Sequence, residues 1–137
     1  AIALYVSQLL FDMGMTKEPR KDHIATREAL HAFSEMSIEQ KNEVIKSDPR
    51  YAHIICRCES VTEGEIVKAL TTNPKPRDLD GVKRRTRSGM GRCQGGFCMP
   101  YVMELIAKHT GTPYDQIQKG RAGSNILVGK TDKGVRD

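Results

Sequence analysis

All four cysteines of this chain lie in one short interval, as two close pairs. Cys56 and Cys58 have one residue between them, and Cys93 and Cys98 have four. Residues 59–92, which separate the pairs, have helical patterns, so a fold can bring both pairs to one site without straining either. Four converging thiolates favour a soft metal centre. This requirement constrains the fold more than any other feature of the sequence.

Three kinds of chemistry compete for such cysteines. A disulfide within Cys56-Arg57-Cys58 would have to distort to reach a normal Cβ separation. A structural zinc ion usually takes about two to four residues between paired ligands, and the first pair is shorter than that. A binuclear iron–sulfur cluster shares four thiolates between two irons and tolerates unequal spacings. The spacing therefore favours a cluster over zinc, and zinc over a disulfide.

Glycines surround the second cysteine pair at positions 89, 91, 95 and 96. Glycine allows the backbone to approach sulfur closely and to adopt positive φ. Backbone N–H groups in such a loop can donate to sulfur, which influences the reduction potential of a cluster. A flexible surface loop would explain these glycines on their own, but two cysteines within the loop favour a cluster-binding role.

Four segments of the chain resemble a known family: 54–59, 61–66, 79–87 and 89–98, which hold both cysteine pairs and a basic segment. They are similar to the 2Fe-2S domain related to bacterioferritin-associated ferredoxin. The resemblance covers residues 35–130 and is strongest to the version at the C-terminus of FAD-dependent glycerol-3-phosphate dehydrogenases of the anaerobic type. The stand-alone ferredoxin has fewer residues between the cysteines of its second pair, so the longer Cys93–Cys98 spacing is closer to the dehydrogenase version.

The resemblance implies a mainly α, small helical domain of helix-turn-helix type, with short extended segments near the cluster. It implies a 2Fe-2S cluster ligated by Cys56, Cys58, Cys93 and Cys98, with zinc as the possible replacement. Such a domain would relay single electrons from a flavin to a one-electron acceptor protein or a quinone-linked subunit. The resemblance implies that the protein lies in the cytoplasm, where partner subunits can hold it at the inner face of the membrane.

The parent enzyme implied by this resemblance oxidises glycerol 3-phosphate to dihydroxyacetone phosphate with FAD. The chain itself has no Gly-x-Gly-x-x-Gly fingerprint and no acid–base constellation. We therefore expect the FAD and substrate sites in an upstream part of the parent protein, and no dehydrogenase activity from this chain alone.

Hydrophobic patterning divides the chain into four parts. Residues 1–13 are apolar nearly all round, which is typical of a helix inside a larger protein. By resemblance they form the last helix of an upstream flavin domain; the alternative is an N-terminal helix packed on this domain's own core. In either case the isolated chain must cover these side chains, by folding back or by pairing with another copy. Residues 14–36 are predicted to be a linker, 37–128 the iron–sulfur-binding helical domain, and 129–137 a mobile tail.

Local signals predict where the helices begin. Capping-box patterns at Ser37 and Thr62 indicate helices to about residues 47 and 70. Asp80 is the predicted N-cap of a helix to residue 88. Pro100 is tolerated only in a first helical turn, which places Cys98 at a helix start, where the dipole favours negative charge.

Two extended segments are also predicted. Residues 124–128 have a strand-like pattern and need a partner, and 51–55 is the obvious candidate. With 38% hydrophobic and 28% charged residues, the chain supports one modest core. No apolar stretch approaches the length that a bilayer requires, so we expect no membrane span.

A basic run, residues 83–92, contains five cations and no acid. It suits a solvated helix face, compensation of the cluster charge or an acidic partner, and least of all nucleic acid, because no aromatic residue interleaves with the arginines. His53, three residues before Cys56, is a conceivable nitrogen ligand, but four thiolates already complete a site.

Overall fold

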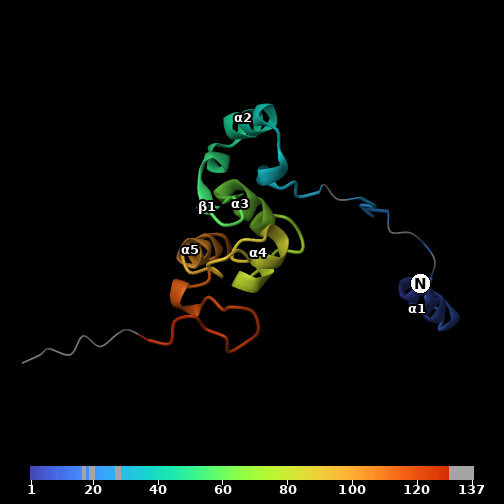
Figure 1. Ribbon diagram of the computed structural model, residues 1–137. Helices are drawn as coiled ribbons and strands as arrows, with labels where there is room; N and C mark the ends of the chain where they lie inside the picture. The colour runs from blue at the N-terminus through green and yellow to red at the C-terminus, as the bar shows by residue number, and fades with distance from the viewer. Residues whose placement is uncertain (17, 19–20, 27–28, 130–137) are drawn as a thin grey trace, which may run out of the picture.

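The computed structural model describes residues 1–137 except 17, 19–20, 27–28 and 130–137, and it is mainly α-helical (Figure 1). Its elements are α1 (Ile2–Asp12), η1 (Phe33–Glu35), α2 (Ile38–Ser47), η2 (Pro49–Ala52), β1 (Ile54–Cys56), β2 (Val61–Thr62), α3 (Glu63–Thr71), α4 (Leu79–Thr86), α5 (Met99–Thr110) and η3 (Tyr114–Gln116). The predicted fold class is confirmed. The predicted tail, apart from Gly129, lies outside the described residues.

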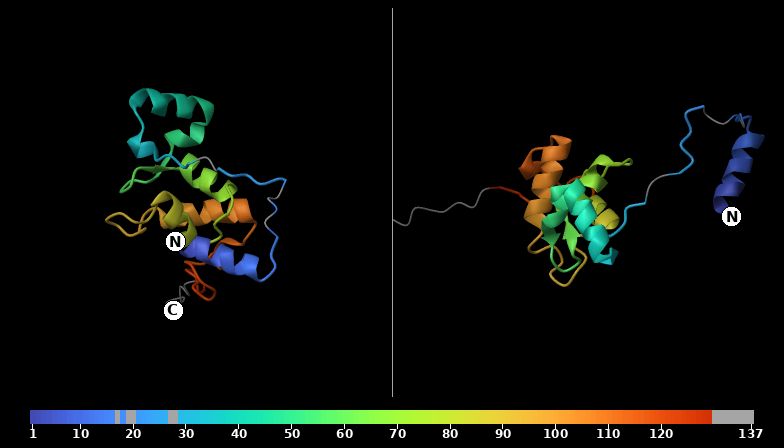
Figure 2. Two further views of the ribbon diagram at one scale, coloured as in Figure 1. Left: turned by 90° about the vertical axis from the view of Figure 1, so that its right-hand side faces the viewer. Right: turned by 90° about the horizontal axis from the view of Figure 1, so that it is seen from above.

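The N-terminal helix α1 stands apart from the rest of the described chain. Figure 1 and the right-hand view of Figure 2 show it away from the body that contains α2 to α5. None of its residues is buried, and Ile2 and Met13 are 81% and 83% exposed. Its apolar surface is therefore open. Among the described helices, none has both the length and the apolar character that a membrane crossing requires.

A single core cluster lies between α3, α4 and α5. Ile66 of α3, Val82 of α4 and Ile106 of α5 are fully buried. Full burial of one such side chain contributes roughly 1.5–3 kcal/mol. Cys56 and Cys98 belong to the same cluster. The packing of three helices thus fixes one cysteine of each pair.

Two capping boxes fix the starts of α2 and α3, as predicted. Ser37 Oγ accepts a hydrogen bond from the Gln40 N–H, and the Gln40 side chain accepts one from the Ser37 N–H. Thr62 and Glu65 make the same pair of bonds. Glu65 also accepts a hydrogen bond from the Phe33 N–H at 2.9 Å. The second box therefore ties η1 to α3.

Helix α4 begins and ends two residues earlier than its sequence predicts. The prediction places the N-cap at Asp80 and the end at residue 88, but the helix spans 79–86 with Asp78 as its N-cap. The Asp78 carboxylate accepts a hydrogen bond from the Gly81 N–H at 2.6 Å. Asp80, in the first turn, instead forms ion pairs with two lysines. Both aspartates suit a helix start, and only their partners distinguish them.

The segment after α5 is fastened to the start of α4. The N–H groups of Leu79 and Asp80 donate to the carbonyls of Gln118 and Lys119. The Asp80 carboxylate accepts a hydrogen bond from Lys119 Nζ at 2.9 Å. Bonds from Lys119 and then from Lys83 lower the pKa of the Asp80 carboxyl. Residues 118 and 119 thus satisfy N–H groups that a helix start otherwise leaves unpaired.

The two strands pair with each other. β1 and β2 are antiparallel neighbours in a two-stranded sheet. The predicted pairing of 51–55 with 124–128 is wrong, because Asn125 makes one isolated bridge with Gln118 instead. A hairpin between neighbouring segments closes a short loop, which costs less chain entropy than pairing across most of the domain.

Candidate metal centre

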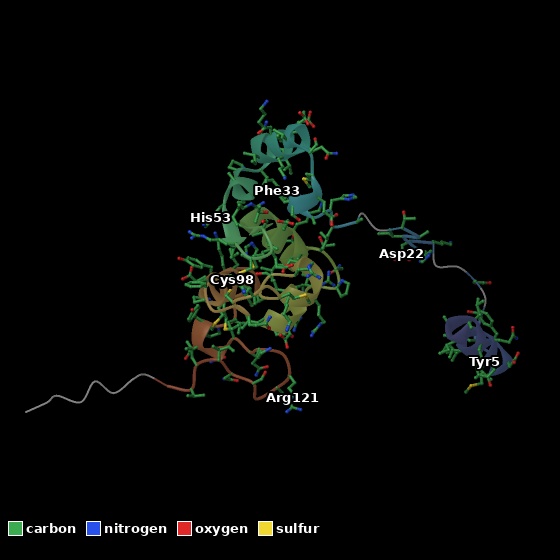
Figure 3. The ribbon with its side chains drawn as sticks, viewed as in Figure 1. Tyr5, Asp22, Phe33, His53, Cys98 and Arg121 are labelled. Atoms are coloured by element: carbon green, nitrogen blue, oxygen red, sulfur yellow. The ribbon has the colours of Figure 1, made fainter. Side chains whose placement is uncertain are left out.

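Two loops of the fold bring the four cysteines together. Cys56 ends β1 and Cys58 lies in the turn to β2, whereas Cys93 and Cys98 come from the loop between α4 and α5. The Sγ atoms of Cys58 and Cys93 are 3.6 Å apart. The side chains of Cys56 and Cys98 also interact, at the start of α5 where Figure 3 labels Cys98. All four are free thiols.

These two contacts differ in burial. Cys56 and Cys98 are only 1% and 2% exposed, and they form the inner pair. Cys58 is exposed and Cys93 is half-buried, and they form the outer pair. Each cysteine loop therefore supplies one inner thiol and one outer thiol.

Backbone N–H groups gather around the outer thiol of Cys93. The N–H of Phe97 is the main cause of a lowered pKa of Cys93, followed by the contact with Cys58 and by the N–H groups of Gly95 and Gly96. Such donors stabilise the thiolate form, which is the form that binds metal. The loop thus presents this sulfur as a ligand.

Burial has the opposite effect on the inner thiol of Cys98. Desolvation raises the pKa of Cys98, a hydrogen bond from Ser88 opposes the rise, and the thiols of Cys56 and Cys93 add to it. Ser88 is 5% exposed, and its Oγ lies 3.8 Å from Cys98 Sγ. Ionising an inner thiol therefore calls for a nearby positive charge such as a metal. Sequence reasoning missed Ser88, since a lone serine ten residues before the cysteine forms no pattern.

Glycines allow the second cysteine loop to reach the first. A Cβ on Gly91 would overlap the Cβ of Cys58, so any side chain there would push the loops apart. Gly89 and Gly95 have φ values of +86° and +88°, which glycine adopts without strain. The predicted roles of these glycines, close approach and positive φ, are confirmed.

The helix after the second loop begins where Pro100 predicts. Cys98 is the N-cap of α5, Pro100 lies in its first turn, and Gly111 ends it in the left-handed conformation. The positive end of the helix dipole therefore lies at the cysteine site, where it favours thiolate charge.

The basic run is partly paired with acids and partly exposed. Arg87 Nε lies 2.7 Å from a carboxylate oxygen of Glu59, the residue after Cys58. Arg84 and Arg92 are exposed, as the solvated-face interpretation expects.

His53 Nδ1 lies 2.8 Å from the Glu63 carboxylate, which gives this ring a partner other than a metal.

The donor set fits a cluster with two irons. Four free thiols are the number that a 2Fe-2S cluster takes, and two of them, Cys58 and Cys93, are already in contact. Within the described part of the chain, no group of three or more Cys, His, Asp or Glu side chains is placed to hold one metal ion.

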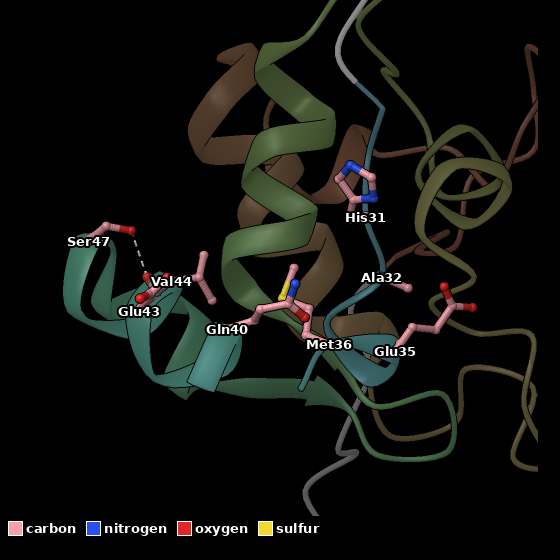
Figure 4. Close-up of a pocket in the computed structure, with 8 residues that line it drawn as sticks. All are labelled: His31, Ala32, Glu35, Met36, Gln40, Glu43, Val44 and Ser47. Atoms are coloured by element: carbon pink, nitrogen blue, oxygen red, sulfur yellow. Dashed lines mark hydrogen bonds between the residues drawn. The ribbon is translucent and has the colours of Figure 1, made fainter. Parts of the chain in front are cut away.

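Two cavities differ in their relation to the cysteines. One of about 680 Å³ lies between η1 and α2 (Figure 4) and is lined by His31, Ala32, Glu35, Met36, Gln40, Glu43, Val44 and Ser47, none of them a cysteine. A smaller one of about 220 Å³ is lined in part by Cys98, Ser88 and Gly95. The roomier cavity is thus separate from the candidate metal centre.

The fold and the four thiols define a small helical metal-binding domain. Residues 54–108, from β1 into α5, match the family model of the BFD-like 2Fe-2S binding domain. The match covers this part of the chain, and the family is described as binding a 2Fe-2S cluster. The resemblance seen in the sequence is confirmed.

Several longer proteins are similar to the chain. A glycerol 3-phosphate dehydrogenase of Caloramator mitchellensis is 47% identical over 136 residues, which are 99% of this chain and 28% of that protein. Hydrogen cyanide synthase subunit HcnB of Pseudomonas aeruginosa is 37% identical over 101 residues, 69% of this chain and 20% of that protein. A subunit of the anaerobic glycerol-3-phosphate dehydrogenase of Escherichia coli K12 is 47% identical over 59 residues, 43% of this chain and 11% of that protein.

The chain thus spans little more than a quarter of the length of the first of these relatives. No solved structure matches it.

Proposed function

We propose that this chain is the iron–sulfur electron-transfer domain of an FAD-dependent oxidoreductase of the glycerol-3-phosphate dehydrogenase type. Its cluster would be held by Cys56, Cys58, Cys93 and Cys98. The observation that carries the proposal is the meeting of four free thiols from two loops, inside a segment that matches a 2Fe-2S family.

Each part of the site has a role in this proposal. A bound cluster supplies one-electron transfer, which suits it to pass on singly the two electrons that a flavin takes up together. The inner pair anchors the site in the core, and the N–H groups around Cys93 and the start of α5 favour its negative charge. The exposed Cys58 brings one edge of the site to the surface, where an acceptor protein or a quinone-linked subunit can approach.

The rest of the chain fits a longer parent protein. We assign residues 1–13 to the end of a flavin domain, 14–36 to a linker and 37–128 to the iron–sulfur domain. The open apolar surface of α1 supports this assignment, because such a surface is normally covered. From the relatives' names, the substrate proposed for the parent is glycerol 3-phosphate, which its flavin part would oxidise to dihydroxyacetone phosphate.

Metal and sulfide analysis of the anaerobically purified chain tests the cluster. We expect about two irons and two acid-labile sulfides per chain, a brown colour and an electron paramagnetic resonance signal after reduction. The double variant Cys58→Ala, Cys93→Ala is the control and should lose all three. A colourless protein with one zinc per chain would overturn the proposal in favour of a zinc-stapled interaction domain.

The relay is tested in the full-length parent protein. A Cys58→Ala, Cys93→Ala variant should still show bleaching of the flavin by glycerol 3-phosphate, but should lose most electron transfer to a one-electron acceptor. Undiminished transfer would contradict the relay. Failure of flavin bleaching in the unaltered protein would contradict the proposed substrate.

A further inference from the structure

Cys58 and Cys93 contact each other across the two loops, and Cys56 and Cys98 lie in the same buried cluster. We infer that Cys58 and Cys93 bind one iron of the cluster and that Cys56 and Cys98 bind the other, so that each iron takes one cysteine from each loop. This inference rests on the proposed function, and it adds which ligands share an iron and which iron accepts the electron.

The distance between the outer sulfurs supports a shared iron. Two thiolates on one tetrahedral metal, at metal–sulfur distances of about 2.3 Å, lie about 3.8 Å apart. The Sγ atoms of Cys58 and Cys93 are already 3.6 Å apart. Thiolates on different irons are further apart, because the iron–iron separation lies between them.

Burial argues against the simpler arrangement in which each loop holds its own iron. Cys56 is 1% exposed and Cys58 is exposed, so the two thiols of the first loop face different surroundings. Cys98 is 2% exposed and Cys93 is half-buried, so the same holds for the second loop. Cys56 and Cys98 belong to the same buried core cluster, and they form the second pair.

The two pairs also differ in how well they accommodate added negative charge. In reduction of the oxidised cluster, a reductant gives up one electron and one ferric iron becomes ferrous. At the outer pair, Cys58 is exposed and Cys93 is half-buried, so solvent reaches both sulfurs and can stabilise added charge. At the inner pair, the Ser88 hydroxyl and the start of α5 also favour negative charge, but Cys56 and Cys98 are both cut off from solvent, so added charge is costly there. The added electron therefore resides at the outer iron.

Four single variants, Cys56→Ser, Cys58→Ser, Cys93→Ser and Cys98→Ser, test both parts of the inference in the anaerobically loaded chain. Serine oxygen is a harder ligand than thiolate and favours ferric iron. We expect Cys58→Ser and Cys93→Ser to lower the midpoint potential by a similar, larger shift. Cys56→Ser and Cys98→Ser should give a similar, smaller shift, and the variants serve as controls for one another.

Other groupings overturn the inference. If Cys56→Ser matches Cys58→Ser and Cys93→Ser matches Cys98→Ser, each loop holds its own iron. If the inner variants give the larger shifts, the electron resides at the inner iron. A wild-type chain without a 2Fe-2S spectrum would instead overturn the proposed function, which is a separate outcome.

A measurement on the unaltered protein keeps the test decisive if a variant fails to load. In the reduced state, the β-protons of cysteines on ferric and ferrous iron shift with temperature in opposite directions in proton NMR spectra. After assignment through their neighbours, Cys58 and Cys93 should share the behaviour of the ferrous site, and Cys56 and Cys98 that of the ferric site. If the β-protons of Cys56 and Cys58 shift in the same direction with temperature, the inference is overturned.

Discussion

The two cysteine loops reach one site by different means. The first connects β1 to β2, and its position follows from hairpin pairing and from the Thr62 cap that comes directly after it. The second is shaped by glycines with positive φ and by the start of α5. The first loop is thus held by regular structure, and the second conforms to it, with Gly91 against Cys58 as the point of contact.

Gly91→Ala should break the meeting of the loops and give the largest effect. The new Cβ would overlap the Cβ of Cys58, which sits on backbone and has little freedom to move. Overpacking of this kind costs about 1–3 kcal/mol, and here it would displace a ligand. We expect loss of most bound iron and sulfide per chain. Gly129→Ala is the matched control, since its Cβ would meet no atom within 4 Å; full iron content in Gly91→Ala would contradict the close approach.

Thiol alkylation of the metal-free protein tests the contrast between the inner and outer thiols of the second loop. Cys93 has a lowered pKa and is half-buried, whereas Cys98 is buried with a raised pKa. Because the thiolate is the nucleophile, Cys93 should react about tenfold or more faster than Cys98 at neutral pH. Peptide mass spectrometry after timed iodoacetamide treatment measures both rates. Equal rates would show that the inner and outer environments do not differ.

Thr62→Ala tests the regular structure that holds the first loop. The hydroxyl is fully buried and caps α3 through the Glu65 N–H, so its loss should cost about 1–2 kcal/mol. For a domain of this size, thermal unfolding followed by circular dichroism should show a Tm lowered by roughly 4–8 °C per kcal/mol. Thr62→Ser keeps the cap and should lose much less. An unchanged Tm in Thr62→Ala would mean that the cap adds no stability.

Ser88→Ala is expected to give the smallest change, at the inner end of the second loop. Its hydroxyl faces Cys98 Sγ at 3.8 Å and favours the more negative, reduced state. Loss of a bond of about 0.5–1.5 kcal/mol corresponds to a potential lowered by about 20–60 mV for one electron. Redox titration at unchanged iron content is the measurement, with Ser47→Ala on α2 as the control. A raised potential would assign the hydroxyl a different role.

Features set by neighbouring residues were predictable from the sequence. The two capping boxes, the helix start at Pro100 and the glycines of the second loop each depend on residues a few positions apart. Local hydrogen bonding and backbone sterics decide such features, so a short window of sequence contains the necessary information.

Features set by distant partners were not predictable in this way. Asp78 caps α4 while Asp80 pairs with Lys119, and nothing near the aspartates reveals that lysine. The partner of β1 was missed for another reason: it lies only a few residues further on, but Val61 and Thr62 are too short a segment to show a strand pattern of their own. Ser88 joins the site only because the fold buries it against Cys98.

The fastening of residues 118 and 119 to α4 has a consequence for the chain's resistance to digestion. The two carbonyls that receive the Leu79 and Asp80 N–H groups depend on residues further along the chain, because the Ser124 carbonyl accepts the Lys119 N–H and Ile126 packs against the core. A protease cut between residues 120 and 124 would therefore release the first turn of α4 and loosen the packing of Val82 in the core. The point at which this domain begins to fail is therefore set some twenty residues beyond the last cysteine, at a contact with no sulfur in it.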